Sequence, residues 1–518
     1  MANERHGIIF SRTHIIINII MTALRLPPPT VLRWAGFFFI SFFLLMWLSP
    51  DSFLMPYWGP RGDSAWFFTC GKAWMEGMTP YVDFADSKGP LLWLIYGIGY
   101  LLSPTSYLGV FWLSVLAYTV TLAIQWRTAR PFVGRREAAA VLVILTFLMF
   151  LPMYHYEVRA EDFCMPWICA AIYCTTRSLQ HPSGAELKKY AFWLGVSMSW
   201  GLLVKWNLFV MMGGMAIVVA IVAVRRHRFS AVVCGVEGII LPLLPFAAYL
   251  AAKGCFIDMI REYFINTFLI TDHGSGATMW KAVFVNNTTN WPTTLKTISQ
   301  FTILAGMALF CKRRQFSWWL LLSFVPFLLF IVLKAPWHYY MAVTIPFFVY
   351  LLSDLASMFS SLLHRMSKRR YAVLLSSVFL LGIVFNGHDH PFAFVAGEPP
   401  MEFTATEQIL MRKPFCKIMF YYHDTFWGIR ACALPACKYW ALQNGATEAM
   451  KEERYQAIRA RKPDFFICYS DNDDLKHLKP LDPKLSSTLR ESGYRQCYTK
   501  IIEDGKTTMK PLPVYEKE

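Results

Sequence analysis

Long apolar runs recur between residues 34 and 386, and they limit this chain to very few kinds of fold. Each run is roughly 15 to 24 residues long, and about 20 residues of helix span the hydrocarbon core of a bilayer. Only 16% of the 518 residues are charged, whereas a soluble domain carries about 25%. The sequence therefore predicts a polytopic α-helical membrane protein.

Eleven transmembrane spans are expected in this region. They cover approximately residues 34–49, 107–126, 138–153, 163–177, 230–252, 297–311, 316–333, 339–358 and 371–386, together with two short helices within 190–224 that meet at a turn near Lys205. Segment 90–104 is also apolar. We expect it to form a short interfacial or half-inserted helix, because another full span would invert the side of every later loop.

Loops that are rich in Lys and Arg alternate along the chain with loops that hold few. The basic loops include "RTARPFVGRR", "RRHR" at 225–228 and "HRMSKRR" at 364–370. Short basic loops stay on the cytoplasmic side, so the net charge of +16 indicates topology and not a nucleic-acid site. We expect the N-terminal segment 1–33 to be cytoplasmic and the protein to lie in a bacterial inner (plasma) membrane.

The composition becomes mixed and polar after residue 387. The strand-like runs "KIMFYY" and "DFFICY" flank the helical pattern "ATEAMKEERYQAIRARK", which predicts a small α/β domain over 387–518. An odd number of spans makes this domain extracytoplasmic. Cys432 and Cys437 lie in it, and in an oxidising compartment they could form a disulfide or remain two free thiols.

The first predicted outer loop, about residues 50–106, mixes charged and aromatic residues in "GDSAWFFTCGKAWMEGMTPYVDFADSKGP". A second outer turn, "RAED", precedes the span at residue 163. Single loop charges are usually solvated, and Lys or Arg at a span end usually reaches toward lipid headgroups. The clustering of acids and bases favours a site instead, because a carboxylate can accept a proton from a hydroxyl while cations stabilise a phosphate leaving group.

These stretches resemble the GT-C superfamily of membrane glycosyltransferases. The closest branch contains the protein O-mannosyltransferases and the bacterial aminoarabinose transferase of lipid A. In that branch the first outer loop opens with an acid and continues through "G..PY.DF.D.K.P" into an apolar stretch, as residues 62–104 do. The turn "LLVKWN" and the later "HYYMAVTIPF" also resemble that branch. The resemblance covers residues 34 to 350 well and the tail loosely.

Two positions depart from the pattern of that branch. Asp63-Ser64 stands where Asp-Glu is common, which removes a second adjacent acid. Lys88-Gly89-Pro90 replaces Lys-Pro-Pro, and glycine still permits a close approach of the backbone.

The resemblance implies an inverting transfer of a sugar from a polyprenyl-phosphate-linked donor to a glycan, lipid or protein acceptor on the outer face. It also implies roles for seven residues. They are Asp63 as catalytic base, Lys88, Lys205 and Arg159 at the donor phosphate, and Glu161, Asp162 and Asp86 to orient the acceptor or hold a metal ion. The resemblance leaves open whether a divalent metal ion takes part.

Two other classes compete with this interpretation. A transporter or flippase for a lipid-linked or polar substrate would place charges deep within its spans and often shows an internal repeat. Charges within the spans are few here, and Glu237 is the clearest of them. The other charges lie at the outer span ends, and the sequence shows no repeat. An inactive protein of the same fold is the other alternative, since Asp63-Ser64 already departs from the pattern.

Overall fold

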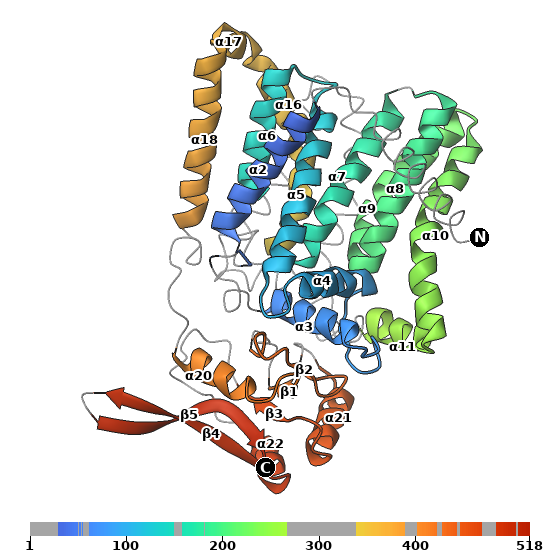
Figure 1. Ribbon diagram of the computed structural model, residues 1–518. Coiled ribbons are helices and arrows are strands. Elements are labelled where there is room, and N and C mark those ends of the chain that lie inside the picture. Colours follow the sequence, from blue (N-terminus) through green and yellow to red (C-terminus); the bar gives the residue numbers. More distant parts are fainter. Residues whose placement is uncertain are drawn as a thin grey trace, which may run out of the picture.

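The described residues up to 388 form a bundle of long helices, and a small domain with a β-sheet lies against one end of it (Figure 1). The computed structural model describes residues 30–49, 51–52, 54, 62–149, 158–180, 182–266, 338–388, 401–421, 427–442, 446–468, 483–503 and 506–518. The expected spans at 297–311 and 316–333 lie outside these residues, as does nearly all of the N-terminal segment 1–33.

The helices of the bundle run between its two ends. They are α2 (Thr30–Leu48), α5 (Leu108–Ala129), α6 (Arg135–Met149), α7 (Ala160–Leu179), α8 (Gly184–Val204), α9 (Trp206–Arg225), α10 (Phe229–Ala252), the 3₁₀ helix η3 (His338–Phe348), α16 (Val349–Met358), α17 (Ser360–Arg365) and α18 (Lys368–His388). Within the described residues, α5, α9 and α10 are long and apolar enough to cross a membrane, and shorter apolar helices accompany them. The helical membrane fold is confirmed, while the count of eleven spans stays a prediction.

Lys205 separates α8 from α9, as the sequence predicts, and its backbone is extended with φ −158° and ψ 108°. The expectation of two short helices is wrong, because α8 has 21 residues and α9 has 20. Helix α8 extends down to Gly184, where Ser183 caps its first turn. It also packs closely on α10, since a Cβ atom added to Gly238 would lie 2.1 Å from the Phe192 carbonyl oxygen.

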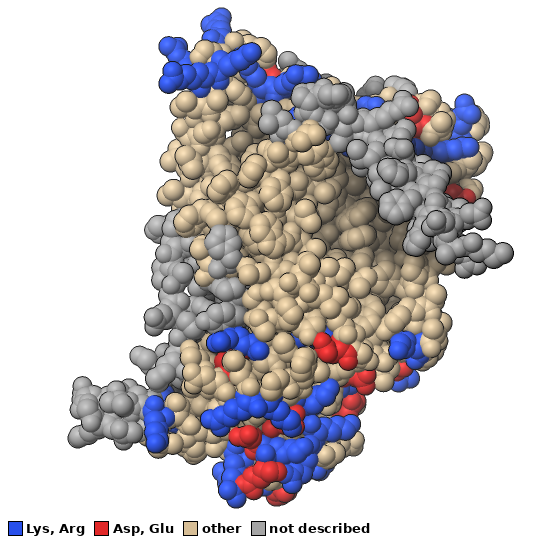
Figure 2. Space-filling view, in the orientation of Figure 1, with Lys and Arg blue, Asp and Glu red and all other residues tan. Residues whose placement is uncertain are grey.

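The basic loops gather at the end of the bundle away from the small domain (Figure 2). The Arg136 guanidinium donates hydrogen bonds to the carbonyl oxygens of Leu363 and Met366, at 2.6 and 2.8 Å. The Arg228 side chain lies beside Gly184 at the start of α8. Loops from distant parts of the sequence therefore share one end, which supports the predicted topology; which side of the membrane that end faces stays a prediction.

The small domain contains a five-stranded mixed sheet in the order β2-β1-β3-β5-β4. Its elements are α20 (Met401–Leu410), β1 (Lys417–Phe420), β2 (Leu434–Pro435), α21 (Glu448–Arg459), β3 (Phe465–Ile467), α22 (Pro483–Glu491), β4 (Tyr494–Glu503) and β5 (Lys506–Lys517). Strands β2, β1 and β3 are parallel, and β5 pairs antiparallel with both β3 and β4. The predicted α/β character is confirmed, and Cys432 and Cys437 are both free thiols.

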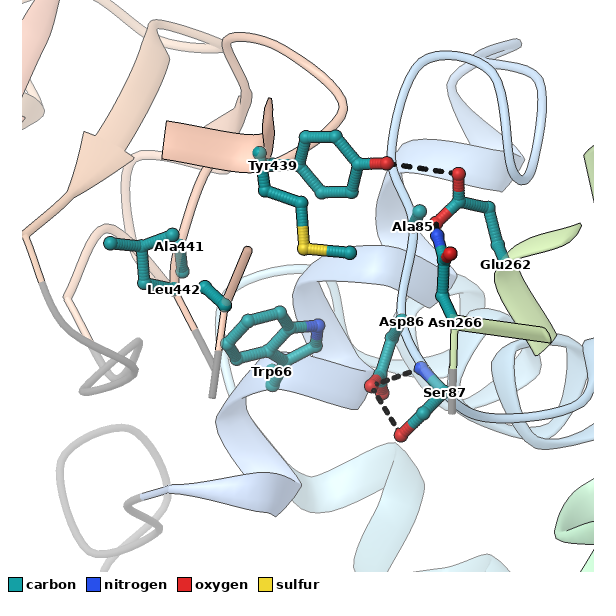
Figure 3. A pocket seen from close by; sticks show the side chains of 11 residues that line it. Trp66, Ala85, Asp86, Ser87, Glu262, Asn266, Tyr439, Ala441 and Leu442 are labelled. Carbon is teal, nitrogen blue, oxygen red and sulfur yellow. Dashed lines mark hydrogen bonds between the residues drawn. The ribbon is translucent and has the colours of Figure 1, made fainter. Parts of the chain in front are cut away.

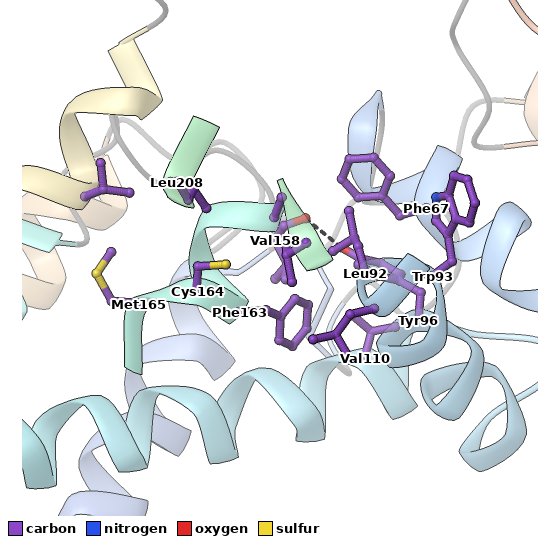
Figure 4. Packing of buried hydrophobic residues seen from close by; sticks show 14 of the residues in the cluster. Phe67, Leu92, Trp93, Tyr96, Val110, Val158, Phe163, Cys164, Met165 and Leu208 are labelled. Atoms are coloured by element: carbon purple, nitrogen blue, oxygen red, sulfur yellow. Dashed lines mark hydrogen bonds between the residues drawn. The ribbon is translucent and has the colours of Figure 1, made fainter. Parts of the chain in front are cut away.

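The first loop contains a helix that the sequence does not suggest, α3 (Asp63–Met75). It crosses the predicted half-inserted helix, which is α4 (Pro90–Leu102). The two backbones touch, because a Cβ atom added to Gly71 would lie 2.4 Å from the Gly97 nitrogen. Aromatic side chains fill the space beside this crossing, with the rings of Phe67 and Tyr96 5.6 Å apart (Figure 4).

The sheet domain contacts the bundle through α3 and the loop that follows it. The Trp66 and Trp440 rings lie 5.3 Å apart, and the Ala85 amide donates to the Lys438 carbonyl oxygen at 3.1 Å. A short turn after α10 joins this contact; it consists of α11 (Phe256–Met259) and the π-helical η1 (Ile260–Ile265). Helix α3 is thus enclosed between the bundle and the sheet domain, which explains the burial of ten of its thirteen residues.

Candidate functional site

Asp63 is the first residue of α3 and is half-buried. Gly62 precedes it with a φ of 63°, a left-handed conformation that glycine adopts without strain and that turns the chain into the helix. The first turn of a helix presents unpaired amide groups and a partial positive charge, which stabilise a carboxylate. The local sequence therefore places an acid at a helix start on the membrane-domain side of the interface.

A chain of hydrogen bonds fixes the first turn of α3. The hydroxyl of Ser64 donates to the carboxylate of Asp51 at 3.3 Å and lies 3.3 Å from the Tyr96 hydroxyl. Tyr96 in turn donates to the Val158 carbonyl oxygen at 2.8 Å. These hydrogen bonds join α3 to α4, to the residues that follow α2 and to the residues that precede α7.

Asp51 is fully buried and was not foreseen as a site residue. Its carboxylate lies beside Ser64, the position where the resembling branch commonly has Glu. A second acid is therefore present near Asp63, although it comes from a different point in the sequence. The signal for it is weak: an acid directly after the first apolar run, in "SPDSF".

Lys88 lies at the other end of the loop, directly before α4. Its Nζ atom is 3.8 Å from an Asp86 carboxylate oxygen and 5.2 Å from the centre of the Phe67 ring. Its backbone carbonyl accepts a hydrogen bond from the Tyr81 hydroxyl at 3.0 Å. Lys88 and Asp86 are both buried, so this cation is held in a low-dielectric region where an anion would interact with it strongly.

Gly89 joins this loop to the break between α8 and α9. Its amide donates to the Val204 carbonyl oxygen at 3.0 Å, a bond that proline could not make. A Cβ atom at this position would lie 2.0 Å from the Leu203 carbonyl oxygen. Glycine in place of the first proline of Lys-Pro-Pro therefore permits a close backbone contact at position 89. This contact places the Lys88 segment against the residues beside Lys205.

Lys205 and Glu161 form a buried ion pair, with 2.6 Å between Nζ and Oε1. Lys205 lies at the helix break, and Glu161 lies in the first turn of α7. The resemblance implies that Lys205 binds the donor phosphate and that Glu161 orients the acceptor or holds a metal ion. The structure brings them together, so each holds the charge of the other in place.

Asp162 caps the start of α7. Its Oδ2 atom accepts the Arg159 amide at 2.7 Å, and its Oδ1 atom accepts the Tyr118 hydroxyl. These contacts give Asp162 a structural role in orienting α7, beside its neighbour Glu161. Arg159 is the half-buried residue that precedes the helix.

The residues expected to form the site thus lie at one end of the bundle on three connected elements: α3 with its following loop, the start of α7, and the α8–α9 break. No group of three or more His, Cys, Asp or Glu residues that could hold a metal ion occurs among the described residues.

Sequence reasoning missed a buried cation on α3. Lys72 is fully buried, and its Nζ atom has no hydrogen-bond partner within the described parts of the chain. Burial lowers the pKa of Lys72 to about 8, partly offset by Glu407. Burial likewise raises the pKa of Glu407, on α20, to about 7. The contact between α3 and the sheet domain thus contains two ionisable side chains whose charged forms are disfavoured by burial. The sequence around Lys72 and Glu407 does not indicate this burial.

Residues 87–251 match the family described as dolichyl-phosphate-mannose-protein mannosyltransferase. The fold is similar to that of ArnT from Cupriavidus metallidurans bound to undecaprenyl phosphate, with a TM-score of 0.59 and 11% identity over 94% of this chain and 97% of that one. The apo state of the same protein gives a TM-score of 0.58 and 13% identity, with the same coverage.

An oligosaccharyltransferase from Archaeoglobus fulgidus, in a complex with zinc and sulfate, gives a TM-score of 0.45 at 12% identity over 92% of this chain and 73% of that one. No curated protein matches the sequence. The resemblance to the GT-C membrane glycosyltransferases is confirmed by the family match and the shared fold.

Proposed function

We propose that this protein transfers a sugar from a polyprenyl-phosphate-linked donor to a hydroxyl of an acceptor at the outer face of a bacterial inner membrane. The observation that carries the proposal is the backbone contact at Gly89, which holds Lys88 against the helix break that bears Lys205. Two buried cations and the acid at the start of α3 thereby belong to one end of a bundle that has a glycosyltransferase fold.

Asp63 is the base in this proposal. The acceptor hydroxyl loses its proton to the Asp63 carboxylate as its oxygen attacks the anomeric carbon of the donor sugar. A bond forms between that oxygen and the carbon, while the bond from the carbon to the phosphate oxygen breaks, and the lipid phosphate leaves with the electron pair. Attack from the side opposite the phosphate inverts the configuration.

The lysines stabilise the leaving phosphate, on which negative charge increases during the reaction. Lys88 is the main contact, and its pairing with Asp86 keeps the ammonium group in place before the donor arrives. Lys205 and Arg159 assist from the α7 side, and Glu161 holds Lys205. The similarity to ArnT, which was solved with undecaprenyl phosphate, makes that lipid phosphate the first candidate carrier.

The proposed organisation assigns the transferase to residues 34–386, with its catalytic loop at 50–106. The domain after residue 387 covers the outer mouth of the site. Membrane lipids surround the bundle and deliver the lipid-linked donor laterally.

The test uses purified protein in proteoliposomes with undecaprenyl-phosphate sugars. We expect release of undecaprenyl phosphate that depends on an added acceptor, together with an acceptor whose mass increases by one sugar residue. Movement of the intact donor between leaflets without any transfer would contradict the proposal and favour a flippase. Absence of both activities with every donor would favour an inactive protein of this fold.

A further inference from the structure

The break between α8 and α9 contains a side chain that the proposed mechanism does not use. The hydroxyl of Tyr263 donates a hydrogen bond to the Leu202 carbonyl oxygen at 2.6 Å, and the Trp206 backbone amide is a second partner of the same hydroxyl. In an uninterrupted helix the amide of residue 206 would bond directly to the carbonyl of residue 202. The Tyr263 hydroxyl therefore takes the place of one helical hydrogen bond at the point where the helix is broken.

A second group from outside the two helices also bonds to the break. The last carbonyl groups of a helix have no partner within it, and the Gly89 amide donates to that of Val204 at 3.0 Å. A Cβ atom at Gly89 would lie 3.1 Å from the Tyr263 hydroxyl oxygen, so these two groups are neighbours. The end of α8 is thus stabilised by the first loop and by the turn after α10 together.

The break determines where the Lys205 side chain lies. This residue has an extended backbone between the two helices, and its Nζ atom is 2.6 Å from Oε1 of Glu161 on α7. A change in the backbone over residues 202–206 would move the ammonium group relative to Glu161. Tyr263 is buried, with 2% of its surface exposed, so its hydroxyl does not exchange its backbone partners for bulk water.

The residue before Tyr263 contacts the sheet domain. Both residues belong to η1, and π-helical turns of this kind are rare and frequent at functional sites. The Oε1 atom of the buried Glu262 accepts the Tyr439 hydroxyl at 2.9 Å (Figure 3) and pairs with the Lys438 Nζ atom at 2.6 Å. Its Oε2 atom accepts the side-chain amide of Asn266 at 2.8 Å. Adjacent residues of η1 therefore connect the sheet domain to the α8–α9 break.

We propose that Tyr263 is a positioning residue for Lys205 and that the sheet domain holds it in place through Glu262. The Tyr263 hydroxyl keeps the break in the geometry that sets Lys205 beside Glu161, where the ammonium group can contact the donor phosphate. This inference rests on the proposed function for the role of Lys205. It adds a dependence of donor binding on a domain outside the helix bundle.

Equilibrium binding of undecaprenyl phosphate to the detergent-solubilised full-length protein tests this without any reaction. Tyr263→Phe removes only a hydroxyl, and its Kd should rise about tenfold, the effect of losing one hydrogen bond to a bound ligand. Tyr350→Phe is the matched control and should keep the wild-type Kd. That tyrosine is also buried, but its hydroxyl pairs with Thr176 and its ring packs on Phe132 in a basic loop. Equal Kd values for Tyr263→Phe and the wild type, or no binding by the wild type, would overturn the inference.

A combined variant separates positioning from direct contact with the lipid. Its background is Lys205→Met with Glu161→Gln, in which the cation and its carboxylate partner are removed together. If Tyr263 acts through Lys205, adding Tyr263→Phe to this background should not weaken binding further. A further tenfold loss would show that Tyr263 acts on the lipid independently, and it would overturn the positioning role.

Lys438→Met tests the link to the sheet domain. It removes the cation that pairs with Glu262 and leaves the break itself unchanged, so the Kd should rise less, by about threefold. Lys451→Met is the control, because that half-exposed lysine on α21 pairs with Glu448 and not with η1. The same Kd in both variants would overturn the role of the sheet domain.

Transfer in proteoliposomes distinguishes the inference from the proposed function. Tyr263→Phe should raise the donor KM about tenfold and leave the acceptor KM unchanged, whereas a loss of folded protein would lower only the maximal rate. An active Tyr263→Phe enzyme with the wild-type donor KM would overturn the inference and leave the proposed function intact. Lipid binding that depends on Tyr263 and Lys205, in a protein that transfers no sugar, would support the inference and contradict the proposed function.

Discussion

The Nζ atom of Lys205 lies 2.6 Å from Oε1 of Glu161, and both side chains are buried at the predicted outer end of the bundle. Lys205 separates α8 from α9, and Glu161 lies in the first turn of α7. The position of the Lys205 ammonium group, which is proposed to attract the donor phosphate, therefore depends on how α7, α8 and α9 pack.

Removing one partner of this ion pair should lower the stability of the protein more than removing both partners. Lys205→Met removes the cation that lies 2.6 Å from the buried Glu161, and Glu161→Gln removes that carboxylate from the buried Lys205, so each single variant should lose about 3–5 kcal/mol of stability. The double variant should regain much of the thermal stability, because both buried charges of the pair are removed together. Thermal unfolding in detergent measures this.

The double variant also separates structure from donor binding. Its donor KM should stay high although its stability returns, because the Lys205→Met change removes the cation that attracts the donor phosphate. A donor KM that returns together with stability would show that Lys205 serves the fold alone.

Gly89→Ala should abolish transfer. The added Cβ atom would lie 2.0 Å from the Leu203 carbonyl oxygen and must push the Lys88 segment away from the helix break. Gly213→Ala on α9 is the matched control, because a Cβ atom there meets nothing within 4 Å. Transfer rates of the two variants in proteoliposomes test this, and an active Gly89→Ala enzyme would show that the close contact is dispensable.

Ser64→Ala should lower kcat with a modest loss of stability, about 1–2 kcal/mol, because it removes the link from α3 to Asp51 and Tyr96. Ser114→Ala is a suitable control. That buried serine bonds to the Val110 carbonyl oxygen of its own helix, so its loss should affect neither the rate nor the fold. Equal rates for both variants would argue that the first turn of α3 needs no such support.

The buried Lys72 predicts a dependence of stability on pH. Its pKa is about 8 in the folded protein and 10.5 when exposed. Between these values the unfolded chain binds more protons than the folded one, so stability rises with pH; below about pH 8 both states are protonated and the burial cost is constant. Thermal unfolding from about pH 7.5 to about pH 10 should show this rise in the wild type.

Lys72→Met should lose that rise, because the variant has no group that titrates there. Lys451→Met, which changes a half-exposed lysine on α21, should keep it. The same pH profile in the wild type and Lys72→Met would mean that Lys72 is solvated in the protein. Glu407 contributes in a lower window, between pH 4.5 and 7, where its raised pKa makes stability fall as pH rises.

The sequence predicted the features that depend on local pattern. Apolar length predicted the membrane helices, and a lysine between two apolar runs predicted the break at Lys205. Helix α3 was missed because "DSAWFFTCGKAWM" has no amphipathic period. It is covered by α4 on one side and the sheet domain on the other, so nearly every position is buried and no polar face remains.

The residues of the candidate site also divide into those that a local pattern could predict and those that depend on packing. Asp63 and Lys88 could be selected because they stand at fixed places in a recognisable loop. Helix packing brings Lys205 to Glu161 and Asp51 to Ser64. These contacts cannot be predicted from the individual residues. The contact between Glu262 and Tyr439 joins segments 177 residues apart, so no local pattern could reveal it.

Replacement of Asp63 is the sharpest test of whether this carboxylate accepts the proton of the acceptor hydroxyl. Asp63→Asn keeps the size of the side chain and its place at the start of α3, but it removes the group that accepts the proton. With an undecaprenyl-phosphate sugar in proteoliposomes, kcat should fall about 10²- to 10⁴-fold, while the donor KM stays almost unchanged and the thermal stability stays normal. Transfer by Asp63→Asn at the wild-type rate would contradict it.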